Sequence, residues 1–215
     1  MKIIAITDIH ADASFLKLAA ENIKKADIVV ISGDITNFTP VSDAVKVIKE
    51  LRKYNRNILA VAGNCDLPPI DEYLTSEGIN LDRRCLECQG VYFAGLCGGV
   101  PAENVDQSRS LQEHFAKSMD ELKTATSGCD PLILVTHQPA KDTMVDQVGG
   151  GSEAVADFIR SRQPMLALSG HIHDSPGKDT IGKTILVNPG PFNQGYYAEI
   201  DVDDGKIVNI EIKQA

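Results

Sequence analysis

Short apolar runs bounded by turn residues recur along the whole chain, and the early ones alternate with segments of helical spacing. The runs predict strands at residues 2–7, 27–32, 57–62, 91–95, 132–136, 165–169, 184–188, 197–202 and 206–212. The spacing predicts helices at residues 14–25, 41–54, 108–126 and 152–162. Because strands that alternate with helices pair mostly in parallel, the first two-thirds of the chain predicts a parallel arrangement.

The last third of the chain has a different pattern. From residue 184 to residue 212 the expected strands follow one another directly, with Gly190, Gly195 and Asp203-Asp204-Gly205 as turn signals. This pattern favours antiparallel ribbons. Both parts fit a mixed sheet, or two stacked sheets, flanked by helices. The 215 residues contain no linker-like stretch, so we expect a single domain over residues 1–215.

Composition and charge narrow the class of protein. With 43% hydrophobic and 24% charged residues, the chain is typical of a globular domain. A formal net charge of -9 leaves no basic stripe for a nucleic-acid polymer and no Lys/Arg run for anionic lipid. The first apolar run ends at Asp8, too early for a signal peptide, and no run is long enough to span a membrane. We therefore expect a cytoplasmic protein whose five irregularly spaced cysteines are reduced.

Potential metal ligands follow five of the apolar runs. They are Asp8 and His10 after the first run, Asp34 after the second, Asn64 and Asp66 after the third, His137 after the fifth, and His171 and His173 after the sixth. Ligands in α/β sheets gather at the carboxyl ends of strands. Taken singly, an Asp or Asn there is usually a turn or capping residue. The joint pattern, which includes four of the five histidines, instead indicates a site for Mn, Fe or Zn.

The order of these residues resembles the five-block signature of the calcineurin-like metallophosphoesterases. The blocks are D-x-H at Asp8, G-D at Gly33, G-N-x-D at Gly63, the single His137, and G-H-x-H at Gly170. The segment Asn188-Pro189-Gly190 is similar to an N-P-G segment of the small bacterial and archaeal branch. The resemblance implies an α/β (α+β) fold, a four-layer αββα sandwich of two mixed β-sheets flanked by helices.

The same resemblance implies two divalent metal ions, with manganese favoured and iron, zinc or nickel as alternatives. One metal would be held by Asp8, His10, Asp34 and His173, and the other by Asp34, Asn64, His137 and His171, so that Asp34 bridges. The nucleophile would be a hydroxide between the metals, and the residues expected to act in catalysis are Asp34, Asn64, Asp66 and His137. The implied activity is hydrolysis of small phosphodiesters or phosphomonoesters.

One position departs from the family pattern. Many members have His after the Asn of the third block, and this chain has Cys65. A neutral thiol is a poor proton donor, and loss of general acid catalysis costs on the order of 10² to 10⁴ in rate for basic leaving groups. We therefore expect a slight preference for diesters. A small buried thiol without a catalytic role is favoured for Cys65, while Asp66 is expected either to bond backbone donors or to orient a water.

Some alternatives stay open at the level of sequence. The chain could be a metal-stabilised, non-catalytic binding or scaffold module of the same fold. A nuclease ranks last, because the chain has no basic face. The loop at residues 140–151, with glycines at 149–151, could be a lid that leads to Ser152 as a helix N-cap, or an ordinary solvent loop. A homo-oligomer is also open.

Overall fold

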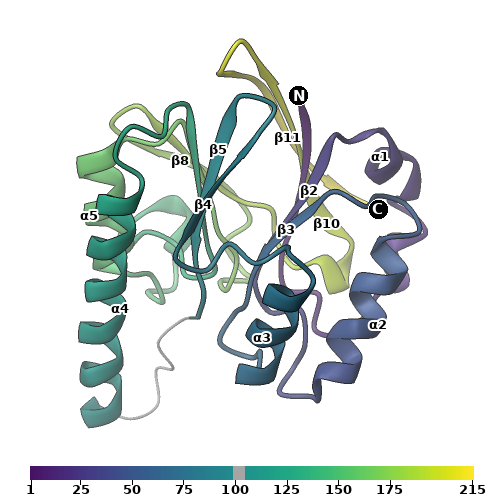
Figure 1. Ribbon diagram of the computed structural model, residues 1–215, viewed down its shortest axis with the longest axis horizontal. Coiled ribbons are helices and arrows are strands. Elements are labelled where there is room, and N and C mark those ends of the chain that lie inside the picture. The colour runs from purple at the N-terminus through teal and green to yellow at the C-terminus, as the bar shows by residue number, and fades with distance from the viewer. Residues whose placement is uncertain (99–104) are drawn as a thin grey trace.

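Two stacked β-sheets form the centre of the protein (Figure 1). The computed structural model describes residues 1–98 and 105–215, without the side chains of residues 105–111. The five-stranded sheet has the order β11 (Lys206–Gln214), β10 (Tyr196–Asp203), β1 (Lys2–Ile6), β2 (Ile28–Ser32) and β3 (Ile58–Val61). The six-stranded sheet has the order β4 (Arg84–Cys88), β5 (Val91–Leu96), β6 (Leu132–Thr136), β7 (Leu166–Leu168), β9 (Thr184–Asn188) and β8 (Gly177–Ile181).

Helices cover the outer face of each sheet, which gives the four layers that the sequence predicts (Figure 1). Helices α1 (Ala20–Lys25), α2 (Val41–Leu51) and α3 (Pro68–Ser76) lie on the side of the five-stranded sheet, and α4 (Val105–Ala125) and α5 (Glu153–Arg162) on the other. Three single 3-10 turns occur at η1 (Ser14–Leu16), η2 (Met144–Asp146) and η3 (Phe192–Gln194). Within the described residues no helix combines the length and apolar character needed to cross a membrane.

Alternation along the strands builds the core between the sheets. In β1, Ile3 and Ala5 face the central layer, while Ile4 and Ile6 pack toward α1 and α2. Phe93 of β5 contributes to the same central layer from the opposite sheet and is fully buried. Because successive side chains of a strand point to opposite faces, apolar strands of this kind must be covered on both sides.

Both sheets are mixed, as expected. Strands β1, β2 and β3 pair in parallel, as do β5, β6, β7 and β9. Of the antiparallel ribbons predicted between residues 184 and 212, β10–β11 is present, whereas β9 lies in the other sheet and pairs antiparallel with β8, which was not predicted. The chain crosses between the two sheets at residues 189–191, where two prolines cannot donate to a sheet ladder.

The helix predicted at residues 14–25 is interrupted. The structure has the turn η1 and the short helix α1 in its place. Leu16 and Ile23 still pack in the core, while Phe15 lies against Gly195 at the end of η3. The helical periodicity of residues 14–25 therefore located the buried face correctly. The helix is interrupted between η1 and α1, next to the residue, Phe15, that contacts Gly195.

Candidate metal centre

The predicted ligands meet at the carboxyl ends of the parallel strands of both sheets. Asp8, Asp34 and Asn64 follow β1, β2 and β3, while His137 and His171 follow β6 and β7. A hydrogen bond joins the two sheets at this edge, because His137 Nδ1 lies 2.8 Å from the carbonyl oxygen of Ser32 at the end of β2. The side chain of a predicted ligand from one sheet is therefore fixed to the backbone of the other sheet.

Asp8, His10 and His173 form a first group. Asp8 Oδ2 is anchored, since it accepts hydrogen bonds from the Thr7 hydroxyl at 2.9 Å and the His171 amide at 3.1 Å. Its other oxygen, Oδ1, faces the Nε2 atoms of His173 at 3.1 Å and His10 at 3.8 Å. The two Nε2 atoms are 3.2 Å apart. One carboxylate oxygen and two imidazoles thus converge on a single point.

A second group surrounds Asp34. Its Oδ1 accepts a hydrogen bond from the Cys65 amide at 2.8 Å. Its Oδ2 faces His137 Nε2 at 3.3 Å and His10 Nε2 at 3.9 Å, so this oxygen addresses both groups. The rings of His137 and His171 pack edge to face with centroids 5.1 Å apart. Asp34 therefore occupies the middle of the ligand set.

Several buried ligand atoms have no hydrogen-bond partner. They are His137 Nε2 and Asn64 Oδ1, and the ring nitrogen of His10 that does not face the carboxylates, Nδ1, also has none. Because Nδ1 of His137 is used at Ser32, Nε2 is the ring atom left to bind a further group. An unpaired buried polar atom is costly, and such atoms beside two buried carboxylates suit a cation. The residues present fit the divalent metals that the sequence predicts.

Three glycines allow the backbone to approach the ligands. A Cβ atom on Gly63 would lie 2.1 Å from Asp34 Oδ1, and one on Gly170 would lie 1.8 Å from Thr7 Oγ1. At Gly33, whose φ is +92°, a Cβ atom would lie 2.5 Å from His137 Nδ1. No real Cβ could occupy these positions, so the glycine before each ligand block has a steric reason.

Four of the predicted ligands adopt left-handed backbone conformations. The φ angles are 54° at Asp8, 49° at His10, 49° at Asp34 and 69° at His171. This region is unfavourable for residues with a Cβ, at a cost of roughly 1 to 3 kcal/mol each. Such conformations cluster at functional sites, where the surrounding structure holds them in place. Sequence spacing gives no sign of this feature.

The electrostatics of the site favour positive charge. Burial disfavours the ionised form of Asp34, but the charge of His137 and the hydrogen bonds from His137 and Cys65 together place the pKa of Asp34 well below its ordinary value. Burial also lowers the pKa of His137, but the charge and hydrogen bond of Asp34, with the charge of Asp8 and the bond to Ser32, together raise this pKa to about 9. Ionised carboxylates thus attract a cation into a buried pocket.

Asp66 ties two loops together. Its carboxylate accepts hydrogen bonds from the amides of Ile35 at 3.0 Å, Thr36 at 2.7 Å and Gly63 at 2.9 Å, and from the Thr36 hydroxyl at 2.9 Å. Of the two alternatives left open for Asp66, the structure shows bonding to backbone donors. Asp66 holds the loop after β2 against the loop after β3, and so positions Asp34 and Asn64.

Cys65 lies closer to the ligands than its sequence position suggests. Its Sγ belongs to a group with His10 and Asp34 whose possible ligand atoms all lie within 4.8 Å of one another. It also accepts a hydrogen bond from Asn64 Nδ2 at 3.3 Å. Burial, followed by the charge of Asp34, raises the pKa of this thiol well above its ordinary value. Cys65 therefore faces the site as a neutral thiol, and all five cysteines are free.

Supporting residues that the sequence did not single out also lie here. Thr7 and Ser32 were included in the predicted strands, yet their polar groups anchor Asp8 and His137. No signal in the sequence separates them from strand residues. Asn188 has a clearer role, since its amide donates to the Ile172 carbonyl at 2.8 Å and holds the His171–His173 segment. This contact places the start of the Asn188-Pro189-Gly190 segment at the wall of the site.

The loop at residues 140–151 is folded against itself. Asp146, which is 5% exposed, accepts hydrogen bonds from the amides of Asp142, Gly150 and Gly151. Ser152 is the N-cap of α5, as predicted, and its hydroxyl accepts from the Val155 amide at 3.4 Å. Hydrogen bonds to Asp146 thus hold this loop together, and it forms a wall beside the candidate metal centre rather than an open solvent loop.

Comparison with known proteins identifies the family of this chain. The model of the calcineurin-like phosphoesterase superfamily domain matches residues 1–204. An uncharacterised protein of Methanocaldococcus jannaschii is 31% identical over 201 residues, which cover 89% of this chain and 88% of the relative.

Solved structures share the fold at low sequence identity. A Thermus thermophilus protein has a TM-score of 0.71 at 21% identity, covering 99% of this chain and 98% of that chain. A putative 5'-nucleotidase from Staphylococcus aureus has a TM-score of 0.64 at 12% identity, covering 99% of this chain and 54% of that chain. Zinc-bound Vps29 from Entamoeba histolytica has a TM-score of 0.55 at 13% identity, with 100% and 98% covered. The family match, over almost the whole chain, shows that this protein belongs to the calcineurin-like phosphoesterase superfamily.

Proposed function

We propose that this protein hydrolyses small phosphoesters with two divalent metal ions and prefers diesters slightly over monoesters. One metal would be held by Asp8, His10, Asp34 and His173, and the other by Asp34, Asn64, His137 and His171. The observation that carries the proposal is the position of Asp34 Oδ2, which faces His137 and His10 while the buried His137 Nε2 and Asn64 Oδ1 have no hydrogen-bond partner.

Each ligand is oriented by a neighbour. Thr7 and the His171 amide hold one oxygen of Asp8, and Ser32 holds His137 by Nδ1, so that Asp8 Oδ1 and His137 Nε2 are left to bind. Two divalent cations at such a site lower the pKa of a water, orient a phosphoryl group and stabilise the attacking and leaving oxygens. The anchoring bonds supply the pre-organised geometry that this chemistry requires.

The preference for diesters rests on Cys65. A thiol occupies the position from which an imidazole could protonate the leaving oxygen, and Asp66 is fully engaged with backbone donors. No side chain next to Asn64 therefore supplies general acid catalysis. Without a general acid, the hydrolysis rate falls least for esters whose leaving groups depart without a proton. This favours activated diesters over alkyl monoesters.

The test is turnover of metal-stripped protein with and without added Mn²⁺. The substrates are bis-p-nitrophenyl phosphate and p-nitrophenyl phosphate, and metal content is measured by elemental analysis. We expect Mn²⁺ to restore turnover of both and to favour the diester by a small factor. Cobalt, zinc and nickel are added in parallel to rank the metals.

Asp34→Asn serves as the matched variant, since it keeps the shape of the side chain and weakens both metal positions. Turnover and the content of both metals should fall together. Full turnover in Asp34→Asn would contradict the proposed site. Two bound metals with no turnover on either substrate would instead favour the metal-stabilised binding module.

A further inference from the structure

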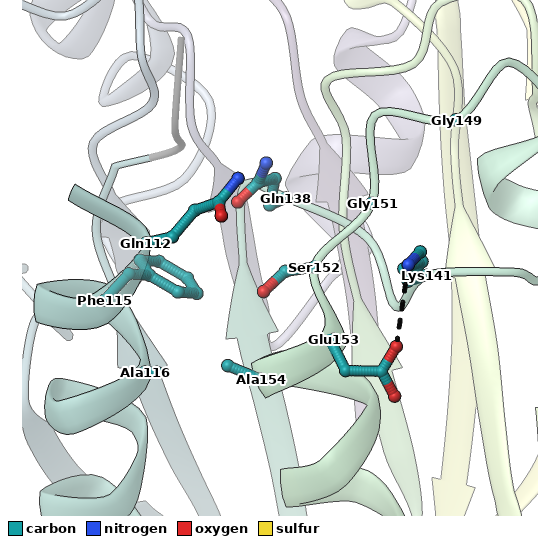
Figure 2. A pocket seen from close by; sticks show the side chains of 10 residues that line it. All are labelled: Gln112, Phe115, Ala116, Gln138, Lys141, Gly149, Gly151, Ser152, Glu153 and Ala154. Atoms are coloured by element: carbon teal, nitrogen blue, oxygen red, sulfur yellow. Dashed lines mark ion pairs between the residues drawn. The ribbon is translucent and has the colours of Figure 1, made fainter. Parts of the chain in front are cut away.

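A cavity of about 400 Å³ lies beside the metal centre, between α4 and the start of α5. Figure 2 shows Gln112 and Phe115 on one wall, from α4, and Gln138 and Lys141 on the segment after β6. Ser152 and Glu153 close the cavity at the start of α5. Ligand pockets have typical volumes of about 300 to 1,000 Å³, so this cavity is large enough for an organic group.

The cavity and the metal centre share a wall. Gln138 directly follows the ligand His137. Gln138 Nε2 donates to the carbonyl oxygen of Gly150 at 3.0 Å. Gly150 in turn lies against the segment that contains His171 and Ile172. A Cβ atom on Gly150 would come within 2.6 Å of Ile172 Cδ1 and 3.4 Å of His171 Nε2. A phosphoester at the metal centre would thus have one of its substituents close to this cavity.

Gln138 offers an unused hydrogen-bond acceptor. The residue is 6% exposed, and because its amide nitrogen is committed to Gly150, its Oε1 is free to accept. That oxygen is buried and has no partner among the described residues. The end of Gln112, an exposed residue, points toward it in Figure 2. Since exposed side chains change rotamer within nanoseconds, Gln112 can move aside for a ligand.

The remaining lining restricts the chemistry of that ligand. Phe115 presents an aromatic ring, and the first turn of α5 leaves backbone N–H groups without intrahelical partners. Glu153 pairs with Arg160 at 2.7 Å and with Lys141 at 3.9 Å, and Arg160 also pairs with Asp157, so two cations and two anions balance in charge. The cavity therefore suits a neutral, planar group that has both a hydrogen-bond donor and an acceptor.

We propose that this cavity binds one organic substituent of the phosphoester, and that Gln138 Oε1 selects a planar substituent with an N–H or O–H donor, as in a nucleoside. The inference rests on the proposed function and makes Gln138 a specificity-determining residue. The donor could come from the base or from the sugar of such a substituent. In either case the free Oε1 acceptor gains a partner.

The test compares two diesters that share one leaving group. Thymidine 5'-p-nitrophenyl phosphate and methyl p-nitrophenyl phosphate are hydrolysed by the Mn²⁺-loaded protein, and the preference is the ratio of their kcat/KM values. We expect Gln138→Met to lower this ratio by about tenfold, the cost of one lost hydrogen bond to a buried partner. Gln147→Met is the matched control, because Gln147 is an exposed glutamine of the loop at residues 140–151 and does not line the cavity.

One further variant and one substrate analogue complete the test of this subsite. Ala116→Leu fills the cavity from the surface of α4 and should lower the same ratio without touching the core. The N3-methyl analogue of the thymidine substrate removes the base donor and keeps the sugar hydroxyl, so it identifies which donor meets Gln138. A ratio that neither Gln138→Met nor Ala116→Leu changes would overturn the inference.

Binding of thymidine to the metal-free protein, followed by ligand-observed NMR, separates this inference from the proposed function. Binding that weakens in Gln138→Met supports the cavity even if no diester is hydrolysed. Hydrolysis of both diesters together with thymidine binding that is absent, or equal in wild type and Gln138→Met, would retain the phosphoesterase and reject the subsite.

Discussion

At the scale of single residues, the glycines before the ligand blocks give the sharpest test. Gly63→Ala places a Cβ atom 2.1 Å from Asp34 Oδ1, so the carboxylate must move. Because a displacement of about 1 Å can cost about 10²-fold in rate, we expect a loss of that order in kcat together with lower metal content. Gly177→Ala is the control, since nothing lies within 4 Å of its Cβ position. Unchanged metal content in Gly63→Ala would show that Asp34 is not held as described.

Asp66 provides a second prediction at this scale. Asp66→Asn replaces one acceptor oxygen by an NH₂ group that faces either the amides of Ile35 and Gly63, at the Oδ2 position, or the amide of Thr36, at the Oδ1 position. Loss of charge-assisted bonds and the new donor-donor contacts should lower the free energy of unfolding by about 3 kcal/mol. Urea unfolding of the metal-free protein measures this change. Because Asp66 acts through the loops, the pH profile of the remaining kcat should keep its shape, and a displaced profile with unchanged stability would assign Asp66 to proton transfer instead.

At the scale of elements, the apolar runs located the buried strands well but missed the exposed elements. Strands β6 and β9 have the predicted bounds, because an uninterrupted apolar run can only be covered on both faces. The edge strands β4 and β8 were not predicted, since they alternate between half-buried and exposed residues and contain charges. Helix α3 was missed because it begins with Pro-Pro and has no capping side chain. The candidate ligands could be listed from order and spacing, whereas the anchoring residues and the left-handed backbone conformations depend on tertiary contacts.

The pairing of β1 with β10 offers a test of pH dependence. Lys2 and Asp201 are register partners, and Lys2 Nζ lies 2.7 Å from Asp201 Oδ1. The hydrogen bond from Lys2 lowers the pKa of Asp201. A lowered carboxylate pKa adds stability above the ordinary carboxylate range, near about pH 4, and this stability is lost as the pH falls through the folded-state pKa.

Asp201→Asn should therefore destabilise the metal-free protein at neutral pH by less than about 1 kcal/mol, because both side chains are partly exposed and screened. The difference from wild type should shrink as the pH falls below about 4, and also in high salt. Urea unfolding at neutral pH and below about pH 4 measures this difference in the free energy of unfolding. A difference that is equal at both pH values would mean that the side chain contributes by packing and not by charge.

At the scale of the whole molecule, the candidate metal centre contains residues of both sheets. Asp8, Asp34 and Asn64 come from loops of the five-stranded sheet, and His137 and His171 come from loops of the six-stranded sheet. An ion bound by both sets requires the sheets to be docked, so it binds the folded chain and stabilises it by linkage. At a free Mn²⁺ concentration about 100 times the Kd, the gain is about 2.7 kcal/mol.

For a chain of this size that gain raises Tm by roughly 5 to 10 °C. Differential scanning calorimetry of stripped protein, with and without Mn²⁺, tests this expectation, and Asp34→Asn should lose most of the increase because its carboxylate faces ligands from both sheets. An increase of equal size in Asp34→Asn would place the stabilising metal elsewhere. Binding without any increase would mean that the unfolded chain binds the ion equally well, and a site that requires the two docked sheets would then have to be abandoned.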